Sequence, residues 1–157
     1  MKKNTYTIPL ALVFCLFFLW AISSNLLPTM IRQLMKTCEL NTFEASFTET
    51  AYWLAYFIFP IPIAMFMKRY SYKAGIIFGL ILAAIGGLLF FPAAILKEYW
   101  AYLCIFFIIA TGMCFLETAA NPYVTVLGAS ETAPRRLNLA QSFNAVSYTH
   151  LRAHETV

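Results

Sequence analysis

The sequence predicts an all-α membrane protein with four transmembrane helices and the start of a fifth. Hydrophobic residues make up 61% of the 157 residues, charged residues only 11%, and the mean hydropathy is +0.71. Soluble domains contain about 45–50% apolar and about 25% charged residues, so a water-soluble globule is not expected. The apolar residues lie in long continuous runs, which indicates helices rather than the alternating strands of a membrane barrel.

Four apolar runs give the expected helices in order. They are Ile8–Met30, residues 47–67, Ala74–Leu96 and Trp100–Leu127. Each is close to or above the roughly 20 residues needed to cross the hydrocarbon core, the second only when residues 47–50 extend it by a turn. The first is too long for a cleaved signal peptide and has no small-x-small cleavage site after it. A fifth helix is expected to begin near Leu137.

Small residues on the third run predict close helix packing. They are Gly75, Gly79, Ala83, Gly86 and Gly87. Such residues let helix backbones approach one another within a bilayer, where no hydrophobic force drives helices together.

Basic residues alternate between successive connections and predict the orientation. Lys2 and Lys3 precede the first helix, the second connection "MKRYSYKAG" is basic, and the fourth connection, before the fifth helix, holds Arg135 and Arg136. Cytoplasmic loops collect Lys and Arg, so the amino terminus is expected in the cytoplasm. The net charge of +4 is explained by this topology, and no nucleic-acid partner is expected.

The stretch "FLETAANPYVTVLG" places an ionisable group in an apolar helix. Glu117 follows Trp100–Leu116, which contains no charged residue. A charge at mid-bilayer costs about 2.5–3.5 kcal/mol on insertion scales, so Glu117 is expected to be neutral, paired or in contact with a water-filled cavity. Burial disfavours the charged form, which makes Glu117 a candidate proton carrier. The alternative is a neutral glutamic acid that only packs against a neighbouring helix.

Amide side chains accompany this acid. Asn121 lies at i+4 from Glu117 on the same helix face, and Pro122 weakens the helix beside it. Asn25 lies within the first helix, and Asn138, Gln141 and Asn144 recur in steps of three in "RRLNLAQSFN". Amides both donate and accept hydrogen bonds and therefore suit a polyhydroxylated ligand. Tryptophans and tyrosines that might stack on a sugar ring are more often interface anchors or packing residues.

Several motifs resemble the fucose permease branch of the major facilitator superfamily. They are "LFFLWAISSNLLP", "PIPIAMFMKRYSYKAGII", "LETAANPYVTVLG" and "RRLNLAQSFN". The resemblance covers nearly all of residues 16–144. It implies a sugar:proton symporter of two six-helix halves in a bacterial plasma membrane, working by alternating access, with this chain as a fragment of the amino-terminal half. It places Glu117 at the proton-linked glutamate and Asn25, Gln141 and Asn144 at sugar-cavity positions.

One position departs from that resemblance. Where the fucose permease pattern has Asn-x-x-Asp in the first helix, this chain has Pro28 in place of the aspartate. The sugar is therefore open: L-fucose is the first expectation, and another hexose such as glucose or galactose is the alternative. A membrane scaffold or sensor without transport is a second alternative.

No enzyme, cofactor or metal site is expected. The chain has no aspartate, no phosphate-binding glycine loop, and no nucleophile with a base beside it. Residues 146–157, "VSYTHLRAHETV", differ abruptly from the apolar helix that the resemblance implies there and are interpreted as a non-native tail on a native part of 1–145. His150 and His154 have the spacing of a helical metal pair, but they lie in this tail and are not assigned a metal.

Overall fold

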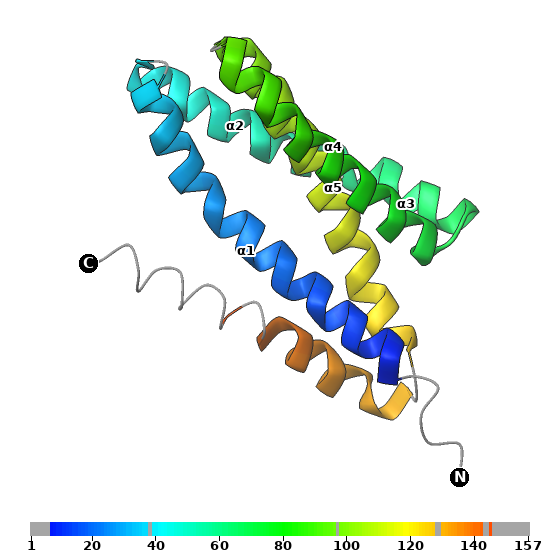
Figure 1. Cartoon of the computed structure of the whole chain (residues 1–157). Helices are drawn as coiled ribbons and strands as arrows, with labels where there is room; N and C mark the ends of the chain where they lie inside the picture. Colours follow the sequence, from blue (N-terminus) through cyan, green and yellow to red (C-terminus); the bar gives the residue numbers. More distant parts are fainter. Residues whose placement is uncertain (1–6, 38, 97, 128–129, 143–144, 146–157) are drawn as a thin grey trace.

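The protein is an almost entirely helical chain that runs back and forth along one direction (Figure 1). The computed structural model describes residues 7–37, 39–96, 98–127, 130–142 and 145. The long helices are α1 (Thr7–Thr37), α2 (Thr42–Ile58), α3 (Pro60–Arg69), α4 (Tyr72–Leu96) and α5 (Tyr99–Val126). A 3₁₀ turn, η1 (Ser130–Thr132), leads into a helix over residues 133–142. The proposed tail, 146–157, lies outside the described residues.

The four predicted membrane spans are present as helices. Segments long and apolar enough to cross a membrane are Pro9–Lys36, Thr42–Arg69, Tyr72–Leu96 and Tyr99–Val126. The second span combines α2 and α3. The next helix begins at residue 133, slightly before the expected Leu137, because Pro134 is tolerated in the first turn of a helix.

The first connection is shorter than the sequence suggested. Helix α1 continues past Met30 to Thr37, and α2 begins at Thr42 rather than near 47. Lys36 in the last turn of α1 complements the helix dipole, and the Asn41 backbone N–H donates to the Glu44 carboxylate at 3.0 Å at the start of α2. These end interactions extend both helices into sequence that is polar enough to resemble a loop.

A break at Phe59 divides the second span. Pro60 and Pro62 have no backbone N–H, so the carbonyls of Tyr56 and Ile58 lose their helical partners. The flanking bonds remain, from the Phe59 N–H to the Ala55 carbonyl at 3.0 Å and from the Ile63 N–H to the Phe59 carbonyl at 2.9 Å. The chain is therefore bent, rather than interrupted by a loop, where α2 meets α3.

Helix α5 forms the centre of the bundle. It contacts α1, α2, α3 and α4. Over its most apolar stretch 56% of α5 is buried, against 22% for each of the other three spans. More of the surface of α5 faces protein, and less of it faces lipid, than in the other three spans. A polar group on α5 is therefore the one best shielded from the bilayer.

Glycines bring α4 and α5 into backbone contact. A Cβ atom on Gly79 would lie 2.8 Å from the Gly112 carbonyl oxygen, and one on Gly112 would lie 2.8 Å from the Ala83 nitrogen. The predicted packing role is confirmed for Gly79, whereas a Cβ on Gly87 would meet nothing within 4 Å. Gly112, on the partner helix, is the half of this contact that the sequence did not indicate.

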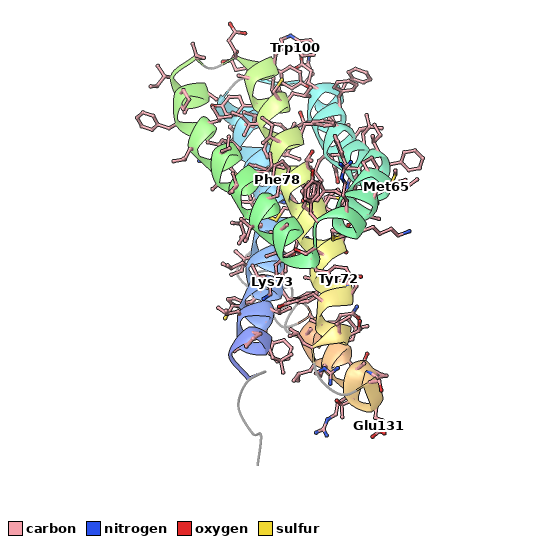
Figure 2. All side chains as sticks on the ribbon, turned by 90° about the vertical axis from the view of Figure 1, so that its right-hand side faces the viewer. Met65, Tyr72, Lys73, Phe78, Trp100 and Glu131 are labelled. Atoms are coloured by element: carbon pink, nitrogen blue, oxygen red, sulfur yellow. The ribbon has the colours of Figure 1, made fainter. Side chains whose placement is uncertain are left out.

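The outer surface of the bundle is apolar. Figure 2 shows side chains projecting on all sides, with Met65 at the outer edge and Trp100 and Glu131 at opposite ends. Phe57 is 83% exposed and Ile61 is 72% exposed, both on the second span. Large side chains of this kind are stable in contact with lipid and unfavourable in contact with water.

Candidate functional site

Glu117 and Asn121 lie one turn apart on α5, within the continuous helix Tyr99–Val126. Both side chains are partly buried. Neither forms a side-chain hydrogen bond or ion pair with another described residue, although buried polar groups normally have partners. The site therefore begins with two adjacent polar side chains whose hydrogen-bonding capacity is unused.

The Asn121 side chain has an unsatisfied acceptor. Its oxygen Oδ1 is buried and has no hydrogen-bond partner among the described residues. Leaving such an acceptor unpaired costs about 1–3 kcal/mol. A donor from a ligand, or from protein outside the described residues, would remove this cost.

An aromatic hydrogen-bonded cluster connects α1 and α2 near this position. The Trp20 indole N–H donates to the Tyr56 hydroxyl at 3.3 Å. The Tyr56 ring packs in turn against the Tyr52 ring, with 5.4 Å between the two ring centroids.

Glu117 and Trp20 also share a pocket. The pocket is lined by Leu16, Phe17, Trp20, Leu116, Glu117 and Ala120 and has a volume of about 10 Å³. That volume is near the lower limit for a single water molecule, so a sugar does not fit in it. Any larger ligand would have to lie against these residues from outside the pocket.

Asn25 lies on α1, one residue beyond Ser24. Its side-chain nitrogen Nδ2 donates to the Ala21 carbonyl at 2.7 Å, and the residue is half-buried. This bond holds the amide nitrogen against its own helix. The structure therefore places Asn25 on α1 with its amide nitrogen already bonded to the same helix.

The amides after α5 are placed less centrally. Gln141 and Asn138 are exposed, and their side chains form no hydrogen bond with another described residue. Asn144 lies outside the described residues. Among the predicted site residues, the structure thus brings Glu117 and Asn121 together directly and leaves Gln141 on the surface of the helix over 133–142.

The sequence did not identify Tyr52 and Tyr56 as site residues. The signal was present: they are spaced i, i+4 within an apolar run, and each hydroxyl needs a partner when buried. The hydrogen bond from Trp20 to Tyr56 depends on how α1 and α2 are aligned, which only the folded chain reveals. Within the described ranges no group of three or more His, Cys, Asp or Glu could hold a metal ion, and His150 and His154 lie outside those ranges.

Comparison with known proteins agrees with this architecture. The profile of the Major Facilitator Superfamily matches residues 10–149. The chain is 49% identical over 144 residues to the L-fucose-proton symporter of Escherichia coli (strain K12), covering 92% of this chain and 33% of that protein. It is 41% identical over 148 residues to the glucose/galactose transporter of Brucella abortus biovar 1 (strain 9-941), covering 94% and 36%.

A solved structure shows the same fold. The chain superposes with a TM-score of 0.80 and 49% identity on the crystal structure of a Major Facilitator Superfamily transporter, FucP, in the outward conformation, covering 92% of this chain and 35% of that one. The chain therefore spans about a third of the length of the relatives it matches. These relatives are transporters and not enzymes, and the predicted fold class is confirmed. The chain is an integral membrane protein and belongs to the Major Facilitator Superfamily.

Proposed function

We propose that this chain forms the amino-terminal part of a secondary transporter that moves a sugar together with protons by alternating access. The observation that carries the proposal is the buried, unpaired Oδ1 of Asn121 one turn from Glu117. A sugar hydroxyl is a suitable donor for that acceptor, and the neighbouring carboxyl group can gain or lose a proton. In this proposal 146–157 is a non-native tail.

The relatives support an L-fucose-type sugar as the first candidate. The symporter of E. coli is named for L-fucose and protons, and the B. abortus relative is named for glucose and galactose. The pocket beside Glu117 and Trp20 is too small for any of these sugars. We therefore place the ligand against Asn121 in a cavity completed by the remaining two-thirds of the transporter, with Asn25, Gln141 and Asn144 as further hydrogen-bonding groups.

The parent transporter, a protein of the relatives' length that contains this sequence, is expected to accumulate sugar in response to a proton gradient. Proteoliposomes with an acidic exterior should take up labelled L-fucose, glucose or galactose, and dissipating the gradient should stop accumulation, because proton entry supplies the driving force. Vesicles without protein are the control. Absence of gradient-dependent uptake for all three sugars would reject sugar:proton symport.

The orientation of the spans gives a separate prediction. A reporter fused after Lys73 should be cytoplasmic and one fused after Glu39 extracytoplasmic, because the basic connections belong on the cytoplasmic side of a bacterial plasma membrane. Figure 1 supports a common side for the start of α1, the α3–α4 turn and the end of α5, since the helices run in alternating directions. A pair of enzymatic reporters, each active on one side only, measures this. The opposite result for either fusion would refute the orientation.

A further inference from the structure

Arg136 joins the helix over 133–142 to the end of α5. Its Nε donates to the Val124 carbonyl at 3.3 Å and its Nη2 donates to the Thr125 carbonyl at 3.1 Å. Its Nη1 donates to the Thr132 hydroxyl. The neighbouring Arg135 is exposed and forms no hydrogen bond with another described residue. Two adjacent arginines with the same charge therefore have different structural environments.

The atoms that Arg136 contacts are the ones a helix end leaves unpaired. The last carbonyls of a helix have no partner within the helix, and its carboxyl end carries partial negative charge. The planar guanidinium reaches two consecutive carbonyls at once, which the single ammonium of lysine does less well. Arg136 therefore caps α5 through both hydrogen bonds and charge.

This cap acts on a segment of α5 that is weakened from within. Pro122 has no N–H, so the Thr118 carbonyl loses its helical bond. Thr125 donates its hydroxyl to the Pro122 carbonyl at 2.7 Å, which adds a bond after the proline but does not replace the one lost at Thr118. The turn of α5 that follows Asn121 therefore depends more on contacts with other segments than the same turn of an uninterrupted helix would.

Apolar packing extends the same connection. Ala140 is fully buried in a cluster with Val13 and Phe17 of α1 and Ala120 and Val124 of α5. Ala120 adjoins Asn121, and Val124 supplies one of the carbonyls that Arg136 caps. Figure 1 shows the helix over 133–142, in orange, beside the start of α1 and the end of α5. Arg136 and Ala140 thus hold one helix face against the part of α5 next to the site.

We infer that Arg136 is a positioning residue that fixes the end of α5 against the helix over 133–142 and thereby sets the placement of Glu117 and Asn121. It acts through α5 and has no contact with the ligand. The inference uses the proposed function only for its transport readout. Arg136 thus has two separable effects: it caps the end of α5, and it sets the surroundings of the Glu117 carboxyl group.

The test compares Arg136→Gln and Arg136→Lys with Arg135→Gln as the matched control, all in the parent transporter in lipid nanodiscs. Backbone amide exchange over residues 123–127 should be about tenfold faster in Arg136→Gln, since charge-assisted hydrogen bonds are lost. Arg136→Lys should restore part of the protection, and Arg135→Gln should match the wild type. Equal exchange in the Arg136→Gln and Arg135→Gln variants would overturn the cap.

A second readout reports on Glu117 without requiring transport. A hydrophobic carbodiimide modifies protonated carboxyl groups within the membrane, and mass spectrometry measures its rate at Glu117. That rate should change in Arg136→Gln, change less in Arg136→Lys and stay constant in Arg135→Gln. Faster amide exchange with an unchanged labelling rate would reduce Arg136 to a cap and overturn the positioning role.

Transport kinetics separate this inference from the proposed function. If the wild-type parent transports sugar, Arg136→Gln should raise KM with a smaller effect on kcat, since the binding groups are displaced while the cycle is retained. An unchanged KM would also overturn the positioning role. If the wild-type parent transports no sugar, the proposed function fails, while amide exchange and carbodiimide labelling still decide the inference on Arg136.

Discussion

Replacement of Glu117 by glutamine is expected to abolish proton-driven accumulation of sugar by the parent transporter while sparing sugar exchange. Glutamine keeps the shape and much of the hydrogen bonding of a protonated glutamic acid but cannot titrate. A charge at mid-membrane costs about 2.5–3.5 kcal/mol, so the protonation of Glu117 should be coupled to hydration and to ligand. Gradient-driven uptake and counterflow exchange, measured in the same proteoliposomes, separate the two effects.

Glu49→Gln is the matched control, because Glu49 is an exposed residue near the start of the second span. It makes the same replacement of a carboxyl group by an amide without touching the site, and accumulation should stay at the wild-type level. Among the acidic residues of the described helices, Glu117 is the one in the interior of an apolar span. Wild-type accumulation by the Glu117→Gln variant would place proton coupling elsewhere in the transporter.

The juxtaposition of Glu117 and Asn121 was predictable because it depends on helical periodicity alone. Residues at i and i+4 share a face of any α-helix, and an apolar run of this length in a membrane must be helical. The Trp20–Tyr56 hydrogen bond was not predictable, because it joins residues 36 positions apart through the alignment of two helices. The cap by Arg136 also depends on how two helices are placed. The sequence did not indicate it, because membrane topology explains a basic segment there equally well.

Proline positions show a further limit of the sequence. Pro28, Pro92 and Pro122 lie inside continuous helices, whereas Pro60 marks the boundary between α2 and α3. Each removes one hydrogen-bond donor. Whether the helix then bends depends on the neighbouring helices, and at Pro60 a second proline two residues later removes another donor. The four spans could therefore be predicted, but the division of the second one could not.

Substitution of Gly112 by alanine is expected to destabilise the bundle by about 1–3 kcal/mol through overpacking. The added Cβ would lie 2.8 Å from the Ala83 nitrogen and 2.8 Å from the Gly79 carbonyl oxygen. Both are backbone atoms, so no rotation of a side chain relieves the contact and α4 has to move away from α5. Thermal or denaturant unfolding in a fixed detergent or lipid measures the loss of stability.

Gly87→Ala is the control for this substitution, since a Cβ there would meet nothing within 4 Å. It should leave stability unchanged or raise it slightly, because alanine favours helix more than glycine does by about 1 kcal/mol. Equal stability of the Gly112→Ala and Gly87→Ala variants would show that the α4–α5 contact tolerates a wider separation than the structure has.

The bend at Phe59 divides the second span into two segments, α2 and α3, that can tilt independently. Above it, α2 is tied to α5 by the Tyr99 hydroxyl, which donates to the Glu44 carbonyl at 3.1 Å. Below it, Met67 of α3 lies where a Cβ on Gly75 of α4 would come within 3.1 Å. An unbroken rod would transmit any tilt from one anchor to the other. Pro60 and Pro62 already remove two helical hydrogen bonds, so a change in the angle between α2 and α3 breaks few further bonds. One end of the second span can therefore tilt without moving the end at the other membrane face.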